Sequence, residues 1–419
     1  MKKLVLSIIL SVSLLGSVFA ENIFAHRFFE VRVDVPIAVS NNLMGLTDIF
    51  QKEVTINLPE LADSVKLDGG ARIRAEAYPT LGINLDIPRG LILGVNIGAD
   101  ADVSLGLSDD IFQFIGHGNA GMGQKFKQKT TNTYVDLFAH VDVTGGWNGK
   151  KNRLAVTGSA FFPLAHLDAG DTYVALYNND EEGEFKAEAN VDAKLYASAD
   201  YSNMDDIQKL IDQSKKGMGF DLSADYQRDL FRFLTVGATA RIPIVPGRLG
   251  MVSKVHYNYP FTLNIDDLLN EKDGDSGNNS GNTSEPEEDK ELEFTSLSTP
   301  YEIHRPLKLG VSANFHPFGT LLSTSGYLGI GVRHPFAKDV NETSFYLDYS
   351  VAGKLSLWNI LNFEMSHSYT DQMFKNEFAI GLNIRLVEVD AGVSFQSTSF
   401  AKSFTGAGIG AYVTACVGF

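Results

Sequence analysis

The stretch Ala407-Gly-Ile-Gly-Ala-Tyr-Val-Thr-Ala-Cys-Val-Gly-Phe419 decides the fold of this chain. Every second residue from Ala407 to Phe419 is apolar, and the residues between them are small or polar. Successive side chains of a β-strand point to opposite faces, so this strand has one apolar face and one face of small or polar residues. A membrane β-barrel uses both faces, because lipid covers one and the lumen lies against the other. An edge strand of a soluble sandwich is the alternative for this segment.

The same alternation recurs along most of the chain. It is clear at 29–37, 91–103, 135–143, 187–199, 234–242, 307–315, 345–357, 361–365, 378–386 and 387–395. The apolar residues stand at even positions up to Leu386 and at odd positions from Val387 onward, which indicates a tight hairpin turn between them. The segment 171–177 is a weaker strand candidate. The pattern predicts an all-β fold, a transmembrane antiparallel up-and-down β-barrel of about 14 strands, within a range of about 14–16.

The beginning of the chain predicts export. Lys2 and Lys3 precede the apolar run 4–19, and Ala20 suits cleavage before Glu21. This pattern is typical of a signal peptide at 1–20, which leaves 21–419 as the mature barrel. No other run approaches the roughly 20 apolar residues of a spanning helix. Membrane contact therefore requires a closed barrel, and we expect the cell outer membrane as its location.

Composition excludes several function classes. The net charge of −16 disfavours nucleic acid as a partner, because phosphate binding needs clustered basic residues. A single cysteine excludes internal disulfides and thiolate metal clusters. The sequence G-x-G-x-x-G at 116–121 lacks the surrounding βαβ pattern of a dinucleotide site, and 273–278 is at most a weak cation loop. The nine histidines show no metal-binding spacing. We expect no enzyme, no cofactor, no metal and no catalytic residue.

Three stretches interrupt the alternation, at 41–68, 108–121 and 204–216. The third is predicted to be a short amphipathic helix. The first two mix apolar residues with helical spacing, and we expect them to fold into the barrel mouth or lumen as a plug. The segment 266–294 is acidic, with nine acidic residues and no aromatic residue between 271 and 293, so it is predicted to be a disordered extracellular loop.

Charged rows occupy the wettable faces of several strands. One row holds Glu184, Lys186, Glu188, Asp192 and Lys194. A second row, Arg72, Arg74 and Glu76, is expected on a neighbouring strand. A hydrated lumen accommodates such rows, whereas a soluble core would bury them at a severe desolvation cost. A sandwich with these charges on its solvated outer face is the alternative.

The segment 42–58, the helix and turn at 110–119 and the final Phe419 together resemble spirochaete outer-membrane barrels, which are similar to the FadL-type long-chain fatty-acid transporters. Phe419 also resembles the signal that the bacterial barrel-assembly machinery reads. The resemblance implies a 14-stranded barrel with an internal N-terminal hatch. It further implies an apolar ligand that binds near the outer rim and leaves laterally through the wall. The chain lacks the Asn-Pro-Ala stretch of that family's hatch.

On this basis we expect long-chain fatty acids or similar hydrophobic molecules, together with outer-membrane lipid, as partners. The apolar residues of the inserts, Ile49, Phe50, Phe112 and Phe114, would line the ligand chamber. Arg72 and Arg74 would meet a ligand carboxylate, or would instead form a lumen ion-pair ladder with Glu76. The alternative functions are a general diffusion porin and a structural or adhesin surface barrel that uses the acidic loop.

Overall fold

A computed structural model describes residues 28–43, 57–67, 70–87, 89–117, 125–130, 133–170, 172–178, 184–201, 212–264, 293–336, 344–370, 372–384, 386–406 and 408–419. The predicted signal peptide, Ile49, Phe50 and nearly all of the acidic loop lie outside these residues. The described strands form one 20-stranded sheet, and their neighbours pair antiparallel.

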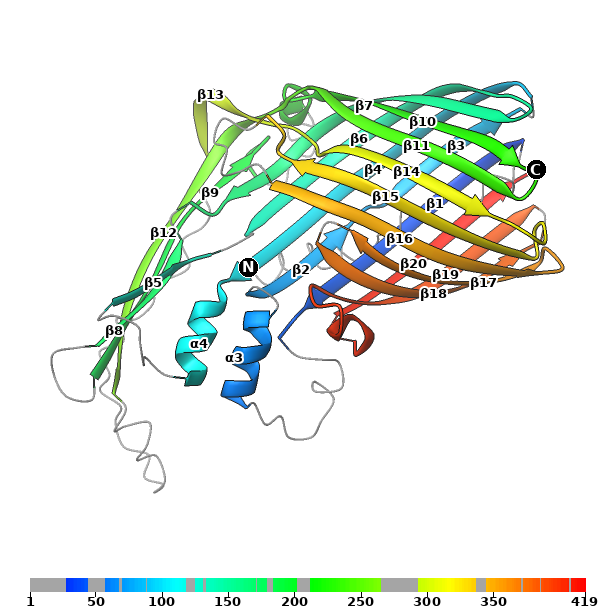
Figure 1. Cartoon of the computed structure of the whole chain (residues 1–419). Helices are drawn as coiled ribbons and strands as arrows, with labels where there is room; N and C mark the ends of the chain where they lie inside the picture. The colour runs from blue at the N-terminus through cyan, green and yellow to red at the C-terminus, as the bar shows by residue number, and fades with distance from the viewer. Residues whose placement is uncertain are drawn as a thin grey trace.

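The barrel wall is a closed ring of 14 antiparallel strands (Figure 1). In order around the ring the wall strands are β1 (Phe29–Asn41), β2 (Ala71–Ala77) with β3 (Thr80–Asp86), β4 (Leu91–Leu107), β6 (Tyr134–Asn148), β7 (Asn152–Asp168), β10 (Gly219–Phe231), β11 (Leu234–Val245), β14 (Leu307–Phe315), β15 (Leu322–Arg333), β16 (Ser344–Leu357), β17 (Leu361–Thr370), β18 (Met373–Asn383), β19 (Val387–Ser397) and β20 (Gly408–Gly418). β2 and β3 share one place in the ring, because they continue in a single register along β1 and β4 on either side of Pro79. Proline has no N–H to donate to a ladder, which explains the interruption.

The first and last wall strands close the ring. β1 and β20 pair from Glu30 with Gly418 to Ser40 with Gly408. At the end of this seam Phe29 and Phe419 exchange two backbone hydrogen bonds of 3.0 Å each. Their rings also approach to 5.9 Å between centroids. The closed barrel predicted from the alternation is therefore confirmed, and no free edge remains along this seam.

The outer surface of the wall is apolar. On β20 the odd-numbered side chains Ile409, Val413 and Val417 are exposed, whereas Thr414 and Cys416 on the other face are buried. The same division holds on β4, where Ile97 is 56% exposed. An apolar exterior around a closed barrel belongs in lipid, so the chain is an outer-membrane β-barrel. Among the described helices, none has the length and apolarity needed to span a bilayer.

The two ends of the barrel differ in their connections. The end that holds Phe29 and Phe419, here called the short-turn end, has brief connections such as 149–151 and 232–233. The opposite end, the long-loop end, carries long connections such as 169–218 and 246–306. Short turns face the periplasm in outer-membrane barrels. We propose on this basis that the long-loop end faces the cell exterior.

Five strands continue the sheet beyond the wall at the long-loop end (Figure 1). They are β5 (Lys125–Lys129), β8 (Tyr173–Asn178), β9 (Glu184–Ala197), β12 (Gly247–Asn264) and β13 (Thr295–Ile303). β9 meets the wall only through four residue pairs with β7, and elsewhere lies between β8 and β12. The prediction that the charges of β9 neighbour Arg72, Arg74 and Glu76 was therefore wrong.

Parts of the two predicted inserts form helices. α3 (Leu58–Leu67) precedes β2, and α4 (Asp109–His117) follows β4. They lie side by side beyond the ends of these strands (Figure 1). Gln113 donates to the carbonyl of Ala62 at 2.8 Å, and His117 lies 2.9 Å from Asp63. A short 3-10 helix, η2 (Lys402–Phe404), lies between β19 and β20.

Candidate functional site

Side chains from opposite walls meet inside the barrel. Arg333, the last residue of β15, reaches Asp102 on β4 at 3.0 Å and Asp136 on β6 at 3.3 Å. Five other wall strands separate β4 from β15 along one side of the ring. The guanidinium also lies 3.9 Å above the ring of Tyr134. Arg333 thus bridges the lumen rather than lining it.

Arg74 extends this bridge toward the seam. It is 2% exposed and pairs with Asp102 through two contacts, of 3.0 and 2.7 Å. It also lies 3.5 Å from Glu76. Lys375 on β18 pairs with Glu76 from across the barrel. The ion-pair ladder expected as the alternative role of Arg74 is therefore present, and Asp102 is its closer partner.

A second group of charges surrounds Arg305, in the segment 304–306 that joins β13 to β14. Its guanidinium lies 2.7 Å from Asp100 and 3.2 Å from Asp221, and it donates to Ser159 at 2.9 Å. These partners belong to β4, β10 and β7, so the segment folds inward from the rim. Arg305 is 4% exposed, which shows that it is part of the barrel interior.

A small apolar cluster lies next to these charges. Phe138, Phe161, Leu249 and Ile303 are buried together, with Tyr196 and Tyr301 packed against them. Leu249 and Ile303 come from β12 and β13, so the base of the projecting sheet packs against β6 and β7. We expected the inserts 41–68 and 108–121 to supply a plug. Among the described residues, contacts across the interior come from β12, β13, β15, β18 and the segment 304–306. The plug expected from the two inserts stays a prediction, because 44–56 and 118–124 lie outside the described residues.

The predicted ligand-binding residues divide into three groups. Arg72 is half-buried on β2 and donates a hydrogen bond to Gln372 at 3.1 Å. Arg74 instead forms ion pairs with Asp102 and Glu76. Phe112 is half-buried on α4. The side chain of Phe114, like Ile49 and Phe50, lies outside the described residues. The assignment of these residues to a ligand chamber stays a prediction.

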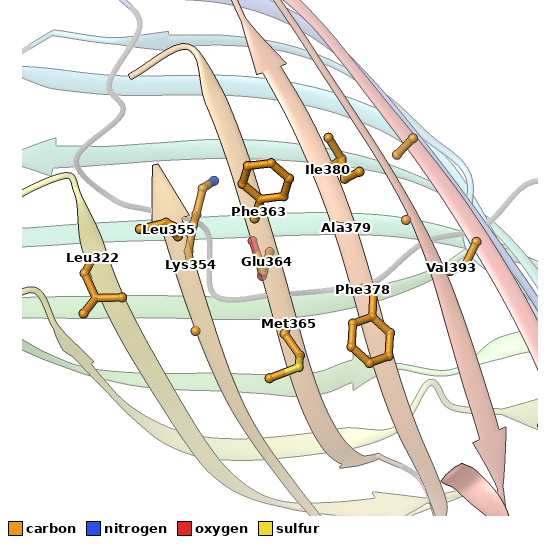
Figure 2. A pocket seen from close by; sticks show the side chains of 13 residues that line it. Leu322, Lys354, Leu355, Phe363, Glu364, Met365, Phe378, Ala379, Ile380 and Val393 are labelled. Atoms are coloured by element: carbon orange, nitrogen blue, oxygen red, sulfur yellow. The ribbon is translucent and has the colours of Figure 1, made fainter. Parts of the chain in front are cut away.

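The outer face of the wall carries a hollow of about 750 Å³ over β16–β19 (Figure 2). Its apolar lining includes Leu355, Phe363, Met365, Phe378, Ile380 and Val393. Small residues of the same face, Gly353 and Ala391, account for the space, since a Cβ added at Gly353 would meet nothing within 4 Å. Lys354 and Glu364, opposite each other in the β16–β17 ladder, also border the hollow. It can hold an apolar molecule against the wall.

No protein-family model matches the sequence, and comparison with curated proteins finds no match either. Among solved structures, the chain is similar to a TodX mutant monoaromatic hydrocarbon channel, with a TM-score of 0.46 and 8% identity over 94% of this chain and 92% of that chain. It is also similar to a Pseudomonas aeruginosa FadL homologue, with a TM-score of 0.46 and 9% identity over 93% and 90%. The translocator domain of the autotransporter NalP from Neisseria meningitidis gives a TM-score of 0.39 and 8% identity over 95% and 90%. Likeness at this level assigns neither a family nor a ligand to this chain.

Proposed function

We propose that this barrel carries hydrophobic or amphiphilic small molecules across the outer membrane, long-chain fatty acids foremost, and releases them laterally through its wall. The observation that supports this proposal is the set of contacts that cross the interior. Arg333, Arg305 and Lys375 each contact carboxylates on distant strands, and the apolar cluster at Phe161 fills the space beside them.

A general diffusion porin needs a continuous hydrated channel. Buried ion pairs that bridge the lumen are costly to separate, because each removed partner leaves an unpaired buried charge. Ions and sugars would have to pass this barrier. A long-chain amphiphile gains about 0.8 kcal/mol for each CH₂ that leaves water, so it can bind to an apolar surface without an open pore.

The outer hollow is the proposed lateral exit. Its volume of about 750 Å³ lies within the common range for small-molecule sites, roughly 300–1,000 Å³. It faces lipid through Met365 and Ile380, which are 60% and 57% exposed. An acyl chain there would exchange directly with the surrounding lipid. Outer-membrane lipid is accordingly the acceptor in this proposal.

Entry is proposed at the long-loop end, at the rim that carries α3 and α4. Phe112 lies on α4 there, and Ile49, Phe50 and Phe114 belong to the same two inserts. Arg72 is the proposed contact for a carboxylate. We further propose Phe419 as the contact for the barrel-assembly machinery.

The exit is tested by filling the hollow. Gly353→Leu places a side chain in open space on β16, and we expect it to slow transfer of a fluorescent long-chain fatty acid into proteoliposomes several-fold. Gly145→Leu on the outer face of β6 is the matched control, because a Cβ there also meets nothing within 4 Å. Equal rates for the two variants would remove the hollow from the route. Absence of transfer by the wild type would contradict the proposed function itself.

The ligand chamber is tested separately by binding. Phe50→Asp plus Phe112→Asp would place charges where an acyl chain is proposed to bind, and we expect fatty-acid affinity to fall. Unchanged affinity would exclude both residues from the site.

A surface-binding role is a second candidate. The sheet formed by β5, β8, β9, β12 and β13 stands beyond the rim, where an external ligand could reach it (Figure 1). This role predicts that deleting 270–293 abolishes binding to host surfaces while fatty-acid transfer continues.

A further inference from the structure

Two histidines and an aspartate from three strands meet at the barrel mouth. Asp136 on β6 and His166 on β7 are directly paired across the strands. Asp136 Oδ1 lies 2.8 Å from His166 Nδ1. His334, next to the end of β15, approaches from the opposite wall, with Nε2 at 3.5 Å from Asp136 Oδ2. All three side chains are buried, and a ligand atom from each lies within 4.8 Å of the other two.

These separations suit ligands of one metal ion. Bonds from zinc to imidazole nitrogen or carboxylate oxygen are about 2.0–2.2 Å long, so two ligands of the same ion lie about 3–3.5 Å apart. The 2.8 and 3.5 Å contacts to Asp136 already fall close to this range. Imidazole together with carboxylate is a common donor set for zinc and for other borderline divalent ions.

The surroundings hold the histidine ligands in place. Tyr301 Oη lies 3.3 Å from His166 Nε2, the ring nitrogen directed away from Asp136. The Tyr301 ring also stacks on His166 at 5.1 Å, and Tyr196 stacks on Tyr301 at 4.2 Å. A hydrogen-bond partner at the second nitrogen fixes the ring orientation of metal-binding histidines. Tyr301 is placed to supply that contact.

The third ligand comes from a strained backbone. His334 has φ of 45°, in the left-handed region that residues other than glycine seldom adopt. Such strain persists where the surrounding structure imposes it. Its ring meets that of His166 edge-on at 5.1 Å. The backbone turn after β15 therefore directs His334 back across the mouth.

Arg333 holds the carboxylate of Asp136 beside the site. Its guanidinium lies 3.3 Å from Oδ2 and is held by Asp102 on its other side. Oδ1 faces His166. A cation held by the two histidines would meet Oδ1 beside His166 and Oδ2 beside His334, and Oδ2 also keeps its ion pair with Arg333.

We propose that Asp136, His166 and His334 bind one divalent transition-metal ion of the zinc class and thereby tie β15 to β6 and β7 across the barrel mouth. The role is structural: the ion would add a coordination bond between walls that ion pairs already connect. The competing arrangement is a metal-free cluster, in which a proton shared by His166 and Asp136 makes the same contact.

Purified full-length barrel, stripped of metal and refolded in detergent, would be titrated with Zn²⁺ by calorimetry and with Co²⁺ by visible absorption. We expect one ion per chain and cobalt ligand-field bands. His166→Gln and His334→Gln should each weaken binding at least about ten-fold, the loss that disturbing a metal site commonly produces. His256→Gln is the matched control, because this histidine lies on β12 with a 69% exposed side chain.

Folding of every variant would be checked by electrophoresis, in which a folded barrel migrates differently before and after heating. Zn²⁺ should raise the melting temperature of the wild type and of His256→Gln, and EDTA should reverse the rise. Failure of the wild type to bind a stoichiometric ion would establish the metal-free cluster. Unchanged affinity in both site variants would likewise overturn the proposal.

Discussion

At the scale of single residues, charge pairing distinguishes the barrel interior from its surface. The carboxylate of Asp102 on β4 forms ion pairs with both Arg74 on β2 and Arg333 on β15, so it connects strands from two sides of the ring. The sequence predicts that Arg74 faces a polar lumen, because its neighbours Ile73 and Ala75 belong to the apolar row. It does not identify Asp102 or Arg333 as partners, since alternation fixes the face of a side chain but not what lies across the lumen.

Arg74→Ala tests the energetic contribution of these pairs. It leaves Asp102 and Glu76 with one cation fewer in a buried setting, where loss of one partner costs about 3–5 kcal/mol. We expect this decrease in the free energy of unfolding, measured by urea titration in lipid vesicles. Arg32→Ala is the control, because its pair with Asp34 is more than a quarter exposed and such pairs contribute about 0–1 kcal/mol. Equal losses in the two variants would show that burial adds nothing to the Arg74 pairs.

At the scale of elements, alternation predicts the wall strands well but not the whole sheet. The parity change at Leu386 and Val387 correctly predicts the hairpin between β18 and β19. The alternating segment 187–199 correctly predicts β9, yet only the end of β9 joins the wall. Apolar and polar residues can alternate along a projecting strand as they do along a wall strand. The period of the pattern alone therefore cannot tell a projecting strand from a wall strand.

The helix pair offers a prediction at this scale. A Cβ added at Gly116 of α4 would lie 2.7 Å from the carbonyl oxygen of Leu58 and 2.5 Å from Cβ of Ala62, both on α3. We expect Gly116→Ala to separate α3 from α4 and expose 58–67 to added protease, while heat-modified migration of the barrel stays unchanged. Gly145→Ala should do neither, because its new Cβ is unobstructed. Continued protection of 58–67 in Gly116→Ala would show that the helices yield without separating.

At the scale of the whole molecule, the closed ring follows from the sequence, but the contacts that cross the lumen do not. Apolar and polar residues alternate because lipid and lumen lie on opposite sides of every wall strand. These contacts join residues far apart in the chain, such as Arg305 with Asp100 and His334 with Asp136. Neither spacing nor composition brings these residues together. The candidate metal ligands escape sequence motifs for the same reason.

Removing both arginines that bridge the lumen should convert the barrel into a channel. Arg305→Ala plus Arg333→Ala leaves Asp100, Asp102, Asp136 and Asp221 with fewer cations, and their mutual repulsion should admit water. In planar bilayers we expect the wild type to be silent and the double variant to pass a steady, cation-selective current, because the remaining carboxylates favour cations. The control Arg89→Ala plus Arg248→Ala removes equal charge from exposed positions and should stay silent. A large steady current through the wild type would instead support the diffusion-porin alternative, and a silent double variant would assign closure to the apolar cluster around Phe161 and Leu249.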